Sequence, residues 1–317
     1  MVTDPADGIA DVSTLVRDLG DNVFMIDTRM GGQENITAAY LIRGSRPTLV
    51  ETGAARSAPL LVGVLATLGI GPDELAAIVV THVHLDHAGG VGDVATAFPG
   101  ASVYVHTNGA RHLVNPERLV ASARRVYGNV MDEVFGDLLP TDTQRVHALA
   151  DGEHVDLGDG RYLAAVDSPG HARHHLGLLD SVSGDLYVGD AAGIFIPETA
   201  EVRAATPPPD FDMAAALHSL EIFAANRPQR LLFSHYGPVS RVDEVLDLST
   251  AELRRWVESA RHALAMAPDL DHAVQLIRQA DASALWRKNP GIEARAMVLN
   301  TDEANLNGIA RWLSLHP

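Results

Sequence analysis

The segment THVHLDH at residues 81–87 is the part of this sequence that most restricts how the chain can fold. It begins where residues 77–81 end, a continuous apolar run typical of a strand buried on both faces. Four side chains that can bind a metal therefore lie within six residues, where the chain leaves a sheet and turns. Because neighbouring side chains on such a turn diverge, they cannot all face one ion. We expect His82 and His84 to point one way and Asp86 and His87 the other, toward two ions held side by side.

The absence of cysteine restricts the chemistry of such a site. The chain has 15 histidines and no cysteine, which excludes disulfides, thiolate ligands, iron–sulfur clusters and cysteine nucleophiles. Imidazole and carboxylate ligands without a thiolate suit zinc, iron or manganese. The sequence also has no G-x-S-x-G nucleophile elbow and no G-x-x-x-x-G-K-[ST] phosphate loop. A metal-activated water is thus the nucleophile that this sequence offers.

The charge of the chain argues against two classes of partner. The 24 Lys and Arg against 41 Asp and Glu give a net charge of −17, which repels phosphate backbones and anionic lipid. We therefore expect a small-molecule substrate and neither nucleic acid nor a membrane as partner. Residues 1–11 carry no basic side chain, and no apolar run reaches the ~20 residues of a membrane span. A cytoplasmic location is the resulting expectation.

Short apolar runs bounded by turn residues predict strands in both halves of the chain. They cover residues 23–26, 39–42, 48–50, 77–81, 102–105, 162–166, 176–179, 186–188 and 230–233. Helical spacing of apolar residues predicts helices at residues 57–68, 108–134 and 213–225, and throughout the segment from residue 242 onward. This pattern indicates an α/β protein built as a layered sandwich.

Three of the later strands are followed at once by a residue that can bind a metal. His171 ends SPGH after residues 162–166, with Pro and Gly forming a tight turn that presents the imidazole. Asp190 follows residues 186–188, and His235 follows residues 230–233. These side chains are the candidates that complete the ligand sets of the two ions.

Taken in this order, THVHLDH, PGH, GD and SHYGP resemble the motifs of the metallo-β-lactamase-fold hydrolase superfamily. The resemblance covers roughly residues 20–240 and implies a four-layer αββα sandwich with the metals at one edge, between two sheets. It implies two divalent metal ions, zinc first, with iron or manganese as alternatives. The implied ligands are His82, His84 and His171 for the first ion, Asp86, His87 and His235 for the second, and Asp190 as the bridge.

Individual residues resemble one branch of that superfamily more than the others. The cysteine-using β-lactamases need a thiolate that is absent here, and flavodiiron oxygen reductases carry Glu where this chain has His84. With Asp190 present, the chain is most similar to the glyoxalase II, thioesterase and lactonase members. It departs from many members in having Glu51 before Thr-Gly, where they have Asp.

The resemblance implies a dinuclear hydrolase in which a metal-bridging hydroxide attacks an ester-like carbonyl of a thioester, lactone or ester. Asp86 is expected to orient the nucleophile or to pass its proton to the leaving group. His175, four residues after His171, is expected to orient the site or to contact the substrate. The hydroxyl of Tyr236 could donate to an oxyanion, with packing as its alternative role.

Two other functions remain open on the same residues. One is a mono-iron persulfide dioxygenase, which shares much of this motif. The other, less favoured, is a non-catalytic binding member that keeps the fold.

The expected domain organisation has a metallo-β-lactamase-like domain at residues 1–240 and a helical C-terminal extension at residues 241–317 packed on it. A helical insert at about residues 108–139 lies outside the shared core and is expected to shape the substrate cleft. The extension holds Trp256, Trp286 and Trp312, which could pack in the core or form the surface of a homodimer.

Overall fold

The computed structural model describes residues 12–316 and divides into two compact units. Within the described residues, the first unit comprises residues 12–166 and 178–184, and the second comprises residues 167–177 and 185–316. The first eleven residues, on which the expectation about a leader rests, lie outside the described residues. The expected boundary at residue 240 stays a prediction.

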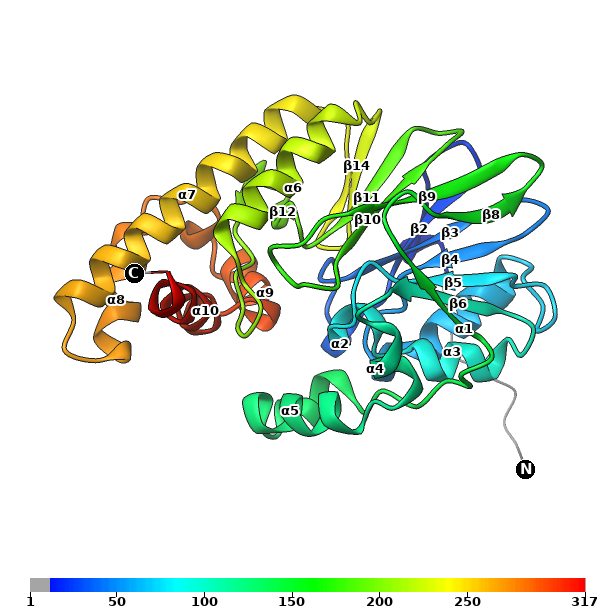
Figure 1. The fold of residues 1–317 in the computed structure, drawn as a ribbon, viewed down its shortest axis with the longest axis horizontal. Coiled ribbons are helices and arrows are strands. Elements are labelled where there is room, and N and C mark those ends of the chain that lie inside the picture. The colour runs from blue at the N-terminus through cyan, green and yellow to red at the C-terminus, as the bar shows by residue number, and fades with distance from the viewer. Residues whose placement is uncertain (1–11, 317) are drawn as a thin grey trace. The chain divides into compact units, whose positions relative to one another are not determined.

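The first unit is built on a seven-stranded mixed sheet with the strands in sequence order (Figure 1). The strands are β1 (Val16–Asp18), β2 (Val23–Asp27), β3 (Ala38–Ile42), β4 (Thr48–Val50), β5 (Ala77–Val79), β6 (Ser102–His106) and β7 (Val146–Leu149). Neighbours are antiparallel from β1 to β4 and parallel from β4 to β7. The carboxyl ends of β4, β5 and β6 therefore meet at one edge, which is where open α/β sheets bind ligands.

Strand β5 consists of apolar residues and is buried at every position. This agrees with the buried strand that the sequence predicts within residues 77–81. Helices α1 (Ala58–Thr67) and α3 (Val91–Ala97) pack against each other in this unit. An antiparallel hairpin of β8 (His154–Gly158) and β9 (Arg161–Asp167) follows later in the chain.

The helical structure expected at residues 108–134 is present, but it is interrupted. The structure has three shorter elements there: α4 (Ala110–Val114), α5 (Glu117–Tyr127) and a π-helical turn at Met131–Phe135. Pro116 cannot continue the hydrogen-bond ladder of α4, and it precedes α5 as its cap residue. Helix α5 has no buried residue, so it is an exposed part of the expected insert.

The second unit contains the parallel pair β11 (Asp185–Gly189) and β14 (Arg230–Phe233), with β15 (Gly237–Val239) antiparallel to β14. Strand β10 (Leu176–Asp180) is divided between the two units. A separate hairpin pairs β12 (Ile194–Ile196) with β13 (Glu201–Arg203). Because β11 and β14 are parallel, the residues that follow them, Asp190 and Ser234, emerge at the same edge.

Helices make up most of the remaining second unit, and the C-terminal ones lie together in Figure 1. They are α6 (Met213–Ala225), α7 (Val242–Met266), α8 (Leu270–Ala280), α9 (Pro290–Leu299) and α10 (Asp302–Leu315). Helices α6, α7, α8 and α10 share one apolar cluster, in which Trp256 is 1% exposed. Trp286 is also buried, in a smaller cluster with Ile196 and Ile292. Helical structure in this segment is as predicted, and the homodimer stays a prediction.

A buried ionic network fastens β13 to the C-terminal helices. The Nη2 atom of Arg203 donates to Oδ1 of Asp302 at 2.7 Å, and neither side chain is exposed. The carboxylate of Asp302 also accepts from Arg278 and Arg287. The Arg203 guanidinium lies 4.9 Å from the ring centroid of Trp286. Burial lowers the pKa of Arg203 to about 10, against the opposing effect of the Asp302 charge.

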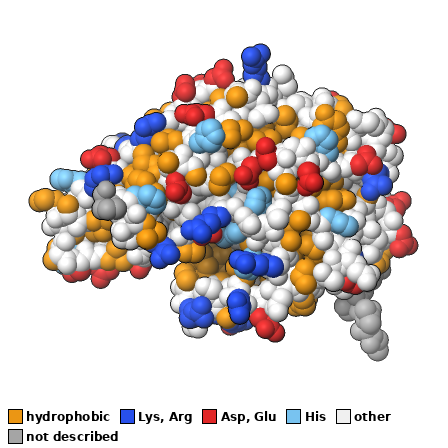
Figure 2. Space-filling model, in the orientation of Figure 1, with side chains coloured by type: hydrophobic (Ala, Val, Ile, Leu, Met, Phe, Trp, Pro, Cys, Tyr) orange, Lys and Arg blue, Asp and Glu red, His pale blue; other side chains and the backbone are white. Residues whose placement is uncertain are grey.

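The surface carries both signs of charge despite the net charge of −17. On the face shown in Figure 2, acidic and basic side chains are interspersed among apolar ones. No helix among residues 12–316 is long and apolar enough to cross a membrane.

Candidate metal centre

The segment THVHLDH leaves β5 at the edge where the parallel strands of the first unit end. After Val79 the chain bends at Thr81, and His84, in an extended conformation, caps the single-turn helix α2 (Leu85–Ala88). His82 and His84 thus precede the helix, and Asp86 and His87 lie on its first turn. We call these four side chains the HxHxDH turn.

His82 and His84 present ring nitrogens to each other. The Nε2 atom of His82 lies 3.0 Å from Nδ1 of His84. On its other side, the Nδ1 atom of His82 lies 3.0 Å from the hydroxyl of Thr81. With Nδ1–H donated to Thr81, the lone pair of His82 Nε2 is directed to the point that His84 Nδ1 also faces.

His87 is held between two carboxylates. Its Nε2 atom lies 3.5 Å from Oδ2 of Asp86, and its Nδ1 atom lies 3.4 Å from Oε2 of Glu51. Glu51 follows β4, is fully buried, and accepts from the backbone N–H of Thr81 at 3.1 Å through Oε1. The longer carboxylate that departs from the family pattern therefore contacts both the backbone and a histidine of this turn.

Asp190 stands between two histidines of the second unit. Its Oδ2 atom lies 3.4 Å from Nε2 of His171, and its Oδ1 atom lies 3.4 Å from Nε2 of His235. All three side chains are less than 10% exposed. We call these residues the Asp190 cluster. One carboxylate oxygen for each imidazole is the arrangement that a bridging carboxylate needs.

The histidines of this cluster are anchored by backbone groups. The Nδ1 atom of His171 lies 3.0 Å from the carbonyl oxygen of Ala205, so that Nε2 is left for the site. Gly170 precedes it at φ +132°, and a Cβ there would lie 2.3 Å from Cα of Ala216. The turn that presents His171 therefore requires glycine for both conformation and space. The loop carrying His235 is fixed by Phe195, whose N–H donates to the His235 carbonyl.

His175 is buried behind Asp190. Its Nε2 atom accepts from the backbone N–H of Asp190 at 3.1 Å, and its Nδ1 atom lies 2.8 Å from the hydroxyl of Ser168. A neutral imidazole that accepts at Nε2 carries its proton on Nδ1, so His175 donates to Ser168. Of the two expected roles, this placement suits orienting Asp190. A direct substrate contact stays a prediction.

Tyr236 follows His235 and is 9% exposed. Its backbone N–H donates to the carbonyl of Phe195 at 3.2 Å, which holds the residue at hairpin β12–β13. The role of its hydroxyl toward an oxyanion stays a prediction.

The donor sets of both units fit divalent metal ions. Two ligands at 2.0–2.1 Å from a tetrahedral ion lie about 3.3 Å apart. The closest pairs are 3.0 Å apart for His82 and His84, 3.5 Å for Asp86 and His87, and 3.4 Å for each contact of Asp190. These nitrogen and oxygen atoms belong to groups that could hold a metal ion. Imidazole and carboxylate donors without thiolate suit zinc, iron and manganese.

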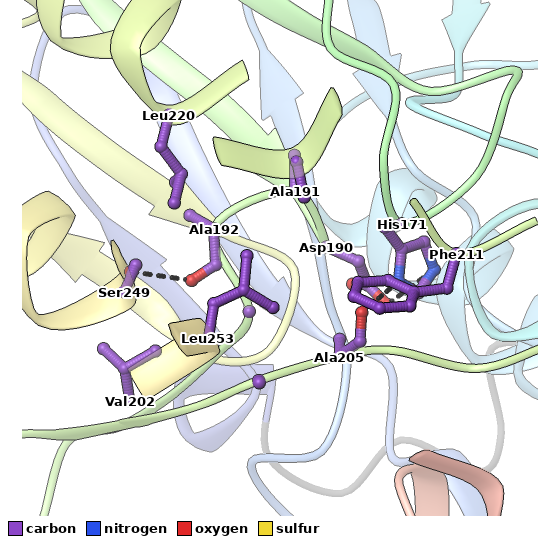
Figure 3. Close-up of a pocket in the computed structure, with 13 residues that line it drawn as sticks. His171, Asp190, Ala191, Ala192, Val202, Ala205, Phe211, Leu220, Ser249 and Leu253 are labelled. Atoms are coloured by element: carbon purple, nitrogen blue, oxygen red, sulfur yellow. Dashed lines mark hydrogen bonds and ion pairs between the residues drawn. The ribbon is translucent and has the colours of Figure 1, made fainter. Parts of the chain in front are cut away.

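A pocket within the second unit reaches the Asp190 cluster (Figure 3). The pocket is narrow and partly open to solvent. Asp190 and His171 line one end, and Ser249 and Leu253 from α7 line the other. The remaining walls are formed by small and apolar residues: Ala191, Ala192, Gly193, Val202, Ala204, Ala205, Phe211, Ala216 and Leu220.

Three residues contact the histidines of the site in ways that the sequence did not predict: Thr81, Ser168 and Glu51. Thr81 and Ser168 lie within the motifs, but nothing in their spacing indicates that their hydroxyls contact His82 and His175. Glu51 stands out as a departure from the family pattern, yet its contact with His87 joins residues 36 positions apart. Glu51 and Thr81 follow the parallel strands β4 and β5, and that position is the signal that could have found them. Ser168 follows β9, which is antiparallel to β8, and carries no such signal.

Comparison with known proteins gives relatives at low identity. The metallo-beta-lactamase fold-containing protein ST1585 of Sulfurisphaera tokodaii is 33% identical over 210 residues, 65% of this chain and 74% of the relative. The chicken acyl-coenzyme A thioesterase MBLAC2 is 30% identical, over 54% of this chain and 63% of that protein. The hydroxyacylglutathione hydrolase of Vibrio campbellii is 28% identical, over 59% of this chain and 60% of that protein. The chain thus spans less than two thirds of the length of the thioesterase and of the hydroxyacylglutathione hydrolase.

Solved structures show the same fold. An archaeal metallo-beta-lactamase superfamily protein, ST1585 from Sulfolobus tokodaii, superposes with a TM-score of 0.64 at 23% identity, over 87% of this chain and 93% of that one. The expected α/β metallo-β-lactamase fold with a helical C-terminal region is therefore confirmed, and its sheets are mixed. Residues 12–235 match the family model of the metallo-beta-lactamase superfamily, more than half of the chain. The chain belongs to the metallo-beta-lactamase superfamily.

Proposed function

We propose that this protein is a dinuclear metal-dependent hydrolase of an ester-like carbonyl, with a thioester as the first candidate and a lactone or simple ester next. The observation that carries the proposal is the position of Asp190, with one carboxylate oxygen 3.4 Å from each of two histidine nitrogens. Relatives named as an acyl-coenzyme A thioesterase and a hydroxyacylglutathione hydrolase support the choice of substrate.

In this proposal His82, His84 and His171 hold one ion, Asp86, His87 and His235 hold the other, and Asp190 bridges them. Zinc is the first candidate, followed by iron and manganese. When bound, the ions would polarise the carbonyl and lower the pKa of a coordinated water toward about 7.

The chain's own residues hold and move protons around that chemistry. Asp86 keeps 15% of its side chain exposed, whereas His87 beside it has none, so of these two proposed ligands Asp86 is the one that solvent and a leaving group can reach. It is proposed to take the proton of the attacking water and return it to the leaving thiolate or alkoxide. Glu51 and Thr81 hold His87 and His82 in the tautomers that leave Nε2 unprotonated.

The test combines metal content with a substrate panel. Elemental analysis of the purified protein should give close to two metals per chain, and the metal-loaded protein should hydrolyse members of a panel of acyl-coenzyme A thioesters, lactones and aryl esters. His84→Ala should lose metal and turnover together. One iron per chain with sulfur-dependent oxygen uptake would instead establish the dioxygenase. Full metal loading with neither activity would support a binding member.

A further inference from the structure

We propose that Asn305, together with Asn300, positions the expected metal ligand His171 from the C-terminal helical segment. The two asparagines act through the backbone of residues 204–206, because the carbonyl oxygen of Ala205 lies 3.0 Å from Nδ1 of His171. In Figure 3, Ala205 and Asp190 both lie beside His171. The consequence for metal binding rests on the proposed function, whereas the orientation of His171 can be tested without it.

The Ala205 carbonyl decides which nitrogen of His171 faces Asp190. A carbonyl oxygen can only accept a hydrogen bond, so Nδ1 of His171 carries a proton and donates it there. Nε2 is the nitrogen that lies 3.4 Å from Oδ2 of Asp190. If this carbonyl moved, the ring could turn or change its tautomer, and either change would take the Nε2 lone pair away from an ion at Asp190.

Two asparagines fix the peptide groups on either side of Ala205. The Nδ2 atoms of Asn300 and Asn305 donate to the carbonyl oxygen of Ala204, at 2.8 Å and 3.1 Å. The Oδ1 atom of Asn305 accepts from the backbone N–H of Thr206 at 2.7 Å, and the Thr206 hydroxyl lies 3.1 Å from the same oxygen. The amide of Asn305 is therefore hydrogen-bonded to the chain both before and after Ala205.

These hydrogen bonds are closed to solvent. Asn305 and Thr206 are fully buried, and Asn300 is 6% exposed. Helix α10 approaches so closely that a Cβ at Gly308 would overlap the carbonyl oxygen of Thr206. Because water has little access, the peptide groups that Asn305 serves would lose their partner without it, and an unpaired buried polar group is costly. We therefore expect residues 204–206 to shift when Asn305 is removed.

Packing and hydrogen bonding on α10 are carried by different residues. Leu306 and Ile309 are fully buried in the apolar cluster that α10 shares with α6, α7 and α8. Asn305 is buried beside them, although an amide costs free energy to bury unless it is hydrogen-bonded. The groups that satisfy it belong to Ala204 and Thr206. A change in packing can therefore be separated from a change in these hydrogen bonds.

The experiment compares three variants of the full chain. Asn305→Ala removes the hydrogen bonds to Ala204 and Thr206, and Asn300→Ala is the milder change, since it removes one of two donors to Ala204. Ile277→Ala is the control: Ile277 is buried in the same apolar cluster on α8, and an alkyl side chain has no hydrogen bond to lose. Denaturant unfolding establishes that each variant is folded under the assay conditions.

The first measurement is made on metal-free protein with 15N-labelled histidines. The Nδ1–H resonance of His171, assigned by its loss in His171→Gln, should be visible in the wild type because the bond to Ala205 slows its exchange with water. It should disappear in Asn305→Ala, weaken in Asn300→Ala and persist in Ile277→Ala. If Asn305→Ala does not fold, Asn300→Ala against Ile277→Ala decides the question.

The second measurement is zinc affinity, determined by competition with a chelator. Asn305→Ala should weaken binding of one zinc ion by about tenfold to hundredfold, as is typical for groups that orient a metal ligand. Asn300→Ala should weaken it less, and Ile277→Ala should bind zinc as the wild type does.

The outcomes separate the positioning role from the proposed function. A His171 resonance that is missing in the wild type, or unchanged in both asparagine variants, overturns the positioning role. An equal loss in Ile277→Ala also overturns it, because packing alone would then orient His171. The expected changes in a wild type and variants that bind no zinc support the positioning role and overturn the proposed function. Zinc binding that is equal in wild type and asparagine variants overturns the link between this orientation and the metal.

Discussion

The Oε2 atom of Glu51 lies 3.4 Å from Nδ1 of His87. The opposite nitrogen of the same ring, Nε2, faces Asp86. If His87 holds a metal ion as proposed, Glu51 lies where a carboxylate can fix the tautomer of the imidazole and raise its basicity. Its other oxygen accepts from the backbone of Thr81, so one buried side chain orients both ends of the HxHxDH turn.

The substitution Glu51→Gln should weaken binding of one metal ion by about tenfold to hundredfold. A neutral amide orients the His87 imidazole and raises its basicity less than a carboxylate does. The measurement is a metal titration followed by stoichiometry at limiting free metal. Glu133→Gln, at an exposed position on the same unit, should bind metal as the wild type does. Unchanged affinity for both ions in Glu51→Gln would show that the contact with His87 is not a support for metal binding.

Asp190→Asn should lose at least one of the two ions, and the hydrolytic activity with it. The amide keeps the shape of the side chain but offers one acceptor in place of two, so one of the two imidazoles loses its shared ligand. Metal content by elemental analysis and turnover are measured on the same preparation. Asp73→Asn, at an exposed site, serves as the control. A variant that keeps full activity would rule out the bridging role of Asp190.

Gly170→Ala should destabilise the protein by about 1–3 kcal/mol and reduce metal content, because the new Cβ would lie 2.3 Å from Cα of Ala216. Denaturant unfolding and elemental analysis measure the two effects. The matched change Gly100→Ala meets nothing within 4 Å and should be close to neutral. Equal stabilities of the two variants would mean that the turn before His171 adapts freely.

Asp302→Asn should lower the free energy of unfolding by about 3–5 kcal/mol at neutral pH, because it leaves the buried Arg203 cation without its counter-charge. Burial opposes ionisation of Asp302, but the charges of Arg203 and Arg287 prevail and hold its pKa below 3.8. The stabilisation is therefore present above pH 3.8 and is lost as the pH falls through the lower pKa of the folded state.

Denaturant unfolding of wild type and variant across this pH range measures the difference. Asp247→Asn, exposed on α7, should show no such pH-dependent loss. A difference that is constant from neutral to strongly acid pH would contradict the ionic role of Asp302.

Strands could be predicted from the sequence where their residues form an apolar run. Strands β4 and β5 are buried at every position, and the apolar runs identify them within a few residues. Strand β1 (Val16–Asp18) was missed because two of its three residues are polar and exposed, and β15 because it contains a proline. The glycines before α3 hid that helix, although Val91 and Val94 on it are buried.

The candidate site could be predicted as far as its motifs extend. His171, Asp190 and His235 follow strand ends, and the structure brings these three side chains together. The pocket could not be predicted, because its walls come from segments as distant as Asp190 and Leu253 and carry no motif. Small apolar side chains of this kind look the same in a sequence whether they fill a core or border a cavity.

Helix α10 lies far in sequence from the expected metal ligands, yet its Asp302 neutralises Arg203 of hairpin β12–β13. A protein shortened before α10 would lack Asp302 and would have to fold hairpin β12–β13 around an uncompensated guanidinium. The same hairpin is hydrogen-bonded to the loop of His235, because the N–H of Phe195 donates to the His235 carbonyl. Trimming the carboxyl terminus to ease crystallisation would therefore disturb the loop behind an expected ligand, and expression work should retain every residue through helix α10.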